Sequence, residues 1–167
     1  MKPKLRTYVT QKKELKTEPF LEVYHRGGTP ELVKVRGGTN RLRIEQGRYV
    51  KEAKEERTCV LCNNGRIEDE KHFILDCQTY EELREKMWRK FESITGEQKE
   101  DIPEEERLNA LIRDRYQSDS EDKNHPNRKR YEKIARVVMA FITTAMSKRR
   151  KLLEQDVQPP PPAAATT

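Results

Sequence analysis

The spacing of three cysteines and one histidine constrains this chain more than any other feature. Cys59, Cys62, His72 and Cys77 follow the pattern Cys-x2-Cys-x9-His-x4-Cys. A Cys-x2-Cys turn lets two thiolates bind one metal ion, and an imidazole and a third thiolate across a short loop complete a tetrahedron that suits zinc. Because this ligand set leaves no position for water, the pattern predicts one structural Zn²⁺ ion.

Two other interpretations of the cysteines compete with zinc binding. A Cys-x2-Cys pair is also typical of thioredoxin-like redox sites, although nothing around Cys59 resembles the βαβ unit of such proteins. The cysteines can also be inert and buried, with an unrelated histidine near them. An odd number of clustered cysteines suits neither a disulfide scaffold nor a secreted protein, so we expect an intracellular location, nuclear or cytoplasmic.

Acidic residues lie among the four ligands, at Asp69, Glu70 and Asp76. We interpret them as hydrogen-bond acceptors for the His72 ring or as acids at a helix N-terminus, rather than as the metal ligands of a nuclease. No Ser-His-Asp arrangement and no glycine-rich phosphate loop occur elsewhere in the sequence. We therefore predict a protein without catalytic activity.

The chain is poor in large apolar residues. Leu, Ile, Val and Phe number 33 of 167 residues, about 20%, which is close to the composition of disordered chains. A structural zinc ion contributes about 10–16 kcal/mol to the folding of small domains and would offset this shortage. No run of residues is apolar enough for a membrane-spanning helix, and we expect no signal peptide behind the basic N-terminus.

Hydrophobic periodicity predicts a mainly α fold, a small zinc-stapled helical domain in which a Cys-x2-Cys knuckle is followed by a helix and a long helix lies near the C-terminus. We divide the chain into four parts. They are a basic helical N-terminal segment (1–38), a zinc-binding CCHC module (39–95), C-terminal helices with a polar loop at 117–127 (96–154), and a disordered Pro/Ala tail (155–167).

Amphipathic spacing locates the main helices within these parts. Helices are expected over residues 80–93, from Pro103 onwards, and over residues 128–154. The alternation of residues 41–44 fits either a helix capped by Asn40 or a strand, and the sequence leaves both open.

Two helix starts are predicted from capping residues. Thr29, before a proline, is expected to cap a helix that ends at Gly38. Thr79 and Glu82 resemble a capping box, in which each side chain bonds the backbone N–H of the other residue.

A run of motifs surrounds the predicted ligands. Gly47-Arg48-Tyr49 precedes the knuckle, residues 67–77 read Ile-Glu-Asp-Glu-x-His-Phe-x-Leu-x-Cys, and Tyr-x-x-Leu-Arg follows at Tyr80. Over about residues 36–90 the sequence resembles the zinc-binding tail that follows the polymerase in non-LTR retrotransposon reverse transcriptases.

The resemblance implies that the chain grips template RNA or target DNA through a basic surface ordered by zinc. It does not imply polymerase activity, because a polymerase palm with its catalytic aspartates is absent from these residues. The chain would then be the tail of a retroelement reverse transcriptase, working beside that enzyme, or a domesticated remnant.

The charges fall into three blocks. Residues 1–54 carry a net charge of +8, residues 55–122 carry −9, and residues 123–167 carry +7. The basic blocks can fold against the acidic middle or can meet a polyanion such as RNA or DNA, and charge alone does not decide between these.

A cluster of arginines just before and within the knuckle offers the most economical phosphate contacts, and a tyrosine beside it offers a stacking platform for a base. The alternative is that Arg41 or Arg48 pairs with the acidic middle and holds the fold together. The candidate nucleic-acid contacts are Arg36, Arg41, Arg43, Arg48, Tyr49, Arg57 and Arg66.

A second hypothesis makes the chain a protein-interaction or oligomerisation domain stapled by zinc. Its long helix would present Phe141, Ile142 and Met146 to a partner or to another copy of the chain. Basic residues at 128–130 and 148–151 could form a second phosphate surface or a nuclear localisation signal, but their default interpretation is solvated helix ends.

Overall fold

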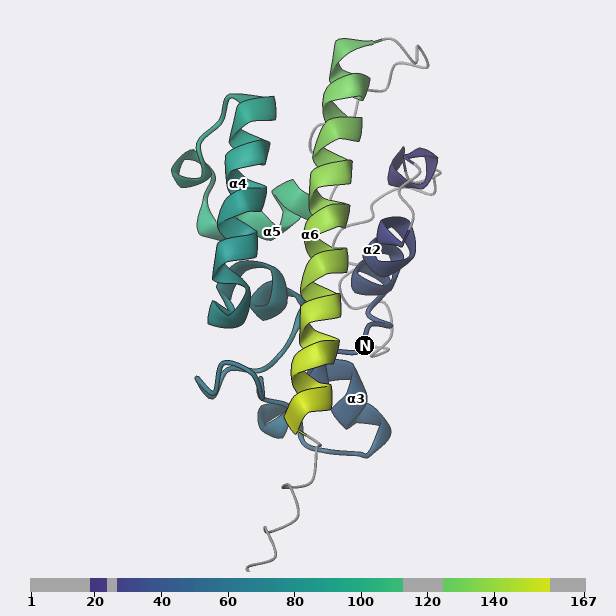
Figure 1. Ribbon diagram of the computed structural model, residues 1–167, viewed down its shortest axis with the longest axis vertical. Coiled ribbons are helices and arrows are strands. Elements are labelled where there is room, and N and C mark those ends of the chain that lie inside the picture. Colours follow the sequence, from purple (N-terminus) through teal and green to yellow (C-terminus); the bar gives the residue numbers. More distant parts are fainter. Residues whose placement is uncertain (1–18, 24–26, 113–124, 157–167) are drawn as a thin grey trace, which may run out of the picture.

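The computed structural model describes residues 19–23, 27–112 and 125–156 (Figure 1). Within these residues the fold is mainly α, with no strand and one isolated antiparallel bridge between Thr58 and Ile67. The predicted mainly α fold with a long C-terminal helix is confirmed. The predictions for residues 1–18, for most of the polar loop and for nearly all of the Pro/Ala tail fall outside the described ranges.

Five α-helices account for most of the described residues, and shorter helical turns connect them. The α-helices are α2 (Gly28–Gly37), α3 (Arg43–Tyr49), α4 (Glu81–Thr95), α5 (Glu104–Ile112) and α6 (Pro126–Asp156). The turns are η1 (Pro19–Glu22), η2 (Lys54–Glu56), η3 (His72–Asp76), η4 (Gln78–Tyr80) and η5 (Lys99–Asp101).

The long helix α6 organises the fold. It runs along the long axis of the molecule, with α4 on one side and α2 on the other (Figure 1), and it packs against α2, α4 and α5. Its inner face is apolar at helical spacing, as the periodicity predicts. The buried residues of this face include Ile134, Val138, Met139, Phe141, Ile142 and Ala145.

The buried apolar residues of the described chain form one cluster. Leu32 of α2, Phe91 of α4 and Val138 of α6 belong to it, and so do Cys59 and Cys77. The N-terminal, cysteine-rich and C-terminal parts of the sequence therefore share a core, and two of the metal-ligand candidates are part of it.

The glycine signals for helix ends are confirmed. Gly38 follows α2 with a φ of 62° and Gly96 follows α4 with a φ of 75°. In this left-handed conformation, which glycine adopts without strain, the Gly96 N–H bonds the Glu92 carbonyl at 2.7 Å.

Both predicted threonine caps are wrong. The helix α2 begins at Gly28, and the Thr29 hydroxyl donates to the carbonyl of Val23 at 3.3 Å. The helix α4 begins after the turn η4 and has no side-chain cap bond, so the capping box at Thr79 is absent. The residue before α2 is Gly27, with a φ of 78°, and the residue before α4 is Tyr80, at the end of η4; neither caps its helix with a side chain.

The segment after Asn40 is helical, which settles the choice between helix and strand. Asn40 lies three residues before the first residue of the helix, and its Oδ1 accepts the N–H of Leu42, the residue directly before α3, at 3.0 Å. The helix α6 begins at Pro126 and ends at Asp156, so it extends beyond the predicted range at both ends. None of the described helices has the length and apolarity needed to cross a bilayer.

Candidate metal centre

The first ligand pair lies on a loop closed by backbone hydrogen bonds. The N–H of Cys59 donates to the Arg66 carbonyl at 2.8 Å, next to the bridge between Thr58 and Ile67. Within this loop Asn63 and Gly65 have φ values of 50° and 70°. These left-handed residues, which asparagine and glycine tolerate best, reverse the chain directly after the Cys-x2-Cys pair.

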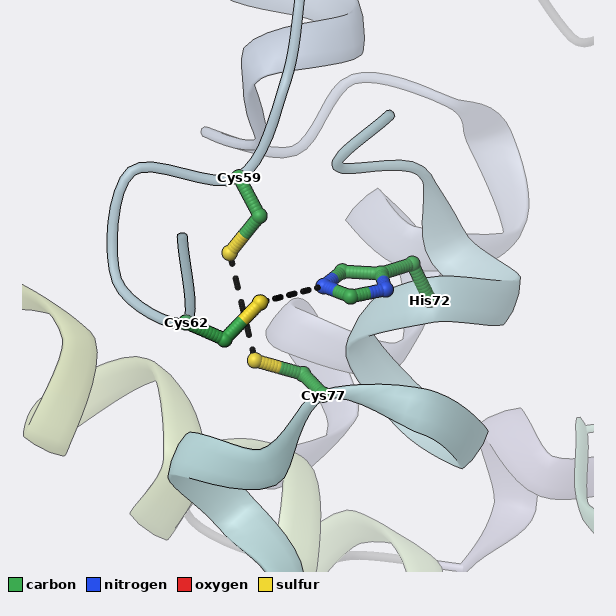
Figure 2. A group of neighbouring side chains, drawn as sticks. All are labelled: Cys59, Cys62, His72 and Cys77. Atoms are coloured by element: carbon green, nitrogen blue, oxygen red, sulfur yellow. Dashed lines mark hydrogen bonds between the residues drawn. The ribbon is translucent and has the colours of Figure 1, made fainter. Parts of the chain in front are cut away.

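The second ligand pair lies on the π-helical turn η3. The N–H of Cys77 donates to the His72 carbonyl at 2.7 Å, which is a bond from residue i+5 to residue i. One wide turn of this kind brings side chains five residues apart to the same side of the chain. The spacing His-x4-Cys therefore suits a π turn, and both side chains face the knuckle (Figure 2).

The four side chains converge on one point (Figure 2). The Sγ atoms of Cys59 and Cys77 are 3.9 Å apart, and Cys62 Sγ is 3.4 Å from His72 Nε2. All four ligand atoms lie within 4.8 Å of one another. In a tetrahedral zinc site the edges would be about 3.8 Å between two sulfurs and about 3.6 Å between sulfur and nitrogen. The group could hold a metal ion.

The site is closed to solvent on most sides. Cys59, His72 and Cys77 are at most 3% exposed, and Cys62 is half-buried. This burial leaves little room for a substrate beside the ligands, which is typical of structural rather than catalytic sites.

Contact between two of the sulfurs shifts their pKa values in opposite directions. The hydrogen bond with Cys77, together with burial, raises the pKa of Cys59 to about 11. The same bond lowers the pKa of Cys77, because the Cys59 thiol donates to the Cys77 thiolate. A divalent cation at this point would instead compensate the charge of several thiolates at once.

The acidic neighbours act on the backbone and on other side chains. Asp69 accepts the backbone N–H of His72 at 2.8 Å, as an acid at a helix N-terminus does. Glu70 accepts from Asn40 at 2.7 Å, and Asp76 pairs with Arg66 at 3.5 Å. His72 Nδ1 is buried without a hydrogen-bond partner among the described residues, so the predicted acceptor role toward the ring is wrong.

Two buried arginines support the site, and neither was predicted to do so. Arg84 of α4 donates to the carbonyls of Ile74 and Cys77, which fixes the end of η3. Arg149 of α6 forms a two-pronged pair with Glu68, at 2.8 and 2.7 Å. Because Arg149 lies four residues after the buried Ala145, its place on the apolar face of α6 was the signal that could have identified it.

Glu68 is the point where α6 meets the knuckle. Its side chain is 1% exposed, and that of Arg149 is 5% exposed. The Glu68 carboxylate also accepts the N–H of Arg43, and its carbonyl accepts the N–H of Ile44. A single residue between two ligands therefore binds both α3 and α6.

Arg36 is buried, which corrects the prediction that it contacts nucleic acid. It is 3% exposed, donates to the Ile112 carbonyl at 2.5 Å, and places its guanidinium 4.7 Å from the centre of the Phe20 ring. An arginine in this position belongs to the core and does not reach a phosphate.

Three further arginines are half-buried and bonded within the fold. Arg43 pairs with Glu52, and Arg48 pairs with Glu45 at 2.8 Å. Arg57 donates to the carbonyls of Ile44 and Glu52. The Arg48 partner lies three residues away on α3, within the basic block 1–54, so this pair is local to the helix and is not the predicted pairing with the acidic middle.

The remaining candidates lie at the surface. Arg41 is exposed, Arg66 exposes 66% of its side chain, and Tyr49 is 73% exposed. The Arg48 guanidinium lies 4.8 Å from the centre of the Tyr49 ring.

The apolar α6 residues predicted to face a partner are buried or half-buried, which corrects that prediction. Phe141 is 4% exposed and Ile142 is fully buried, while Met146 is half-buried and packs against the core. The ring centres of Phe141 and Phe73 are 6.2 Å apart. Phe73 directly follows the predicted ligand His72 in the sequence. Phe141 and Ile142 stabilise the fold and are not available to a partner, whereas Met146 is only partly covered.

Comparison of the chain with protein-family models, with curated proteins and with solved structures finds no match in any of the three.

Proposed function

We propose that the chain is a non-catalytic module, stabilised by one structural Zn²⁺ ion, that binds nucleic acid. The observation that carries the metal assignment is the closed group of three thiols and one imidazole at tetrahedral spacing. Soft thiolate ligands with an imidazole favour zinc over calcium, magnesium or manganese.

Metal analysis of the purified protein tests this assignment. We expect one zinc ion per chain, lost in Cys62→Ser and in His72→Ala. The matched control is His125→Ala, which removes a histidine far from the ligands in the sequence and should retain the ion. Folded protein without bound metal would contradict the structural role.

Nucleic-acid binding is supported by the exposed groups around the knuckle. Arg41 and Arg66 present cations and Tyr49 presents a largely free ring, which together suit phosphates and an unpaired base. The resemblance to reverse transcriptase tails favours the same partner, template RNA or target DNA. The chain would work as such a tail or as a domesticated remnant, in the nucleus or cytoplasm.

Fluorescence anisotropy with labelled RNA and DNA over a salt series tests the binding. Affinity should fall with salt, because neutralised phosphates release counterions. Arg41→Ala and Arg66→Ala should each weaken binding and lower the salt slope by about 1. Arg89→Ala, an exposed change on α4, is the control. Zinc-loaded wild-type protein that binds no nucleic acid would overturn the proposal.

A further inference from the structure

The outward face of α6 is strongly basic. Exposed cations occur near both of its ends: Lys129, Lys133 and Arg136 toward the N-terminus, and Lys148, Arg150 and Lys151 toward the C-terminus. The described carboxylates of α6 are Glu154, whose side chain is 68% exposed, and Glu132, whose side chain is 37% exposed and lies 3.7 Å from Arg128. The imbalance creates a field that attracts polyanions.

Helical geometry places these cations on one side of the molecule. At 3.6 residues per turn, Lys129, Lys133, Arg136 and Lys151 fall on one stripe, opposite the buried Val138 and Ile142. From Lys129 to Lys151 the stripe is about 33 Å long. The face turned away from α2 and α4 therefore presents charge near both ends of the helix.

Three of these six cations, all lysines, are not compensated by contacts within the described part of the chain. No ion pair to a described residue involves Lys129, Lys133 or Lys151. Lys148 donates to the Thr79 carbonyl, which leaves its charge in place, and Arg150 is 3.9 Å from Glu154 with both side chains mostly exposed.

The middle of the stripe is uncharged and carries small side chains. Ala140 and Thr144 are exposed there, and Ser147 is half-buried. The aromatic residues of α6, Tyr131 and Phe141, are buried on the other side. A face without an aromatic platform is poorly suited to stacking unpaired bases, whereas small side chains let a helix approach a groove closely.

We infer that this face of α6 docks on double-helical DNA, an inference that rests on the proposed nucleic-acid function and adds a second surface to it. The small residues enter the major groove of B-form DNA, which is about 12 Å wide and admits an α-helix. The cations at the two ends contact phosphates on either side of the groove. A-form RNA has a deep, narrow major groove that does not admit the helix.

Anisotropy titrations of the zinc-loaded chain test the inference. The probes are a DNA duplex and an RNA duplex of about 20 base pairs, roughly two turns, the corresponding single strands, and polyglutamate as a competitor. Lys129→Gln/Lys133→Gln removes two cations far along the chain from the ligands. Lys86→Gln/Lys90→Gln makes the same change at the same spacing on the exposed face of α4.

We expect Lys129→Gln/Lys133→Gln to weaken DNA-duplex binding about tenfold and to lower the salt slope by about 2, with single-strand binding and zinc content unchanged. The α4 variant should bind like wild type. Equal behaviour of the two variants overturns the inference while leaving the proposed function in place. Preference for the RNA duplex or single strands, or displacement by polyglutamate, also overturns it. Wild-type protein that binds no nucleic acid removes the proposed function itself.

Discussion

Gly47 lies where α3 passes very close to two other side chains. A methyl group at this position would lie 2.1 Å from Glu52 Oε2 and 2.6 Å from Arg57 Cγ. Arg57 has little freedom to move, because its guanidinium bonds two backbone carbonyls. The residue is therefore required for packing, independently of any contact with a ligand.

We predict that Gly47→Ala destabilises the zinc-loaded protein by about 1–3 kcal/mol, the usual cost of overpacking. Urea denaturation monitored by circular dichroism measures this. Gln46→Ala, at an exposed position of the same helix, should change stability by less than about 0.5 kcal/mol. Equal stability of the two variants would show that the neighbours of Gly47 move aside without cost.

Single residues differ in how well the sequence predicts them. The four ligands were predictable because each pair is local and its spacing matches a known chelating turn. Arg36 was not, since its partner Ile112 is 76 positions away and only the tertiary fold brings them together. Its register with the buried Leu32 and Val35 on α2 was the signal that it points inward.

At the scale of elements, the Glu68–Arg149 pair is the strongest polar link between α6 and the knuckle. Removal of one member of a buried pair leaves a charge without a partner in a medium of low polarity, at a cost of about 3–5 kcal/mol. The neighbouring Arg150, at 64% exposure, carries the same charge into solvent and offers a matched comparison.

We predict that Arg149→Met destabilises the protein by about 3–5 kcal/mol, whereas Arg150→Met costs less than about 0.5 kcal/mol. Adding Glu68→Gln to Arg149→Met should recover part of the loss, because the unpaired carboxylate disappears. Denaturation midpoints of these variants, with Glu68→Gln alone completing the double-mutant cycle, measure the coupling. An Arg149→Met protein as stable as Arg150→Met would mean that solvent reaches Glu68.

Helices were easier to predict than their beginnings. The apolar stripe and glycine stop of α4 are local properties, and both were correct. Its start was wrong because the chain reaches it through a turn tied to Cys77, while the Thr79 carbonyl accepts from Lys148. For α3, the alternating residues 41–44 fit a helix and a strand equally. In the structure the segment is helical, and just before it the Asn40 side chain bonds Leu42 and Glu70.

At the scale of the whole molecule, the metal group and the hydrophobic core are continuous. Cys59 and Cys77 lie in the same cluster as Trp88 of α4 and Phe141 of α6. Loss of the metal should therefore affect helices that carry no ligand. The composition predicted a shortage of apolar residues, but it did not predict that the ligands themselves would be part of the core, because this depends on how α6 packs.

We predict that a zinc chelator causes a joint loss of helical circular dichroism and a red shift of Trp88 fluorescence, both reversed by added zinc. Structural zinc contributes folding free energy directly, so the two signals should change at the same chelator concentration. The same chelator saturated with zinc before it is added serves as the control. Helices that persist after zinc removal would separate the metal group from the core.

The link between Glu68 and Arg149 also sets an order of events during synthesis. The two residues are 81 positions apart, so the ribosome releases all four ligands long before it releases the arginine. A nascent knuckle that has already captured its ion must hold the Glu68 carboxylate in water until α6 arrives. Burial of that carboxylate, and with it the final form of the metal centre, is therefore a late step that waits for nearly the whole of α6 to be translated.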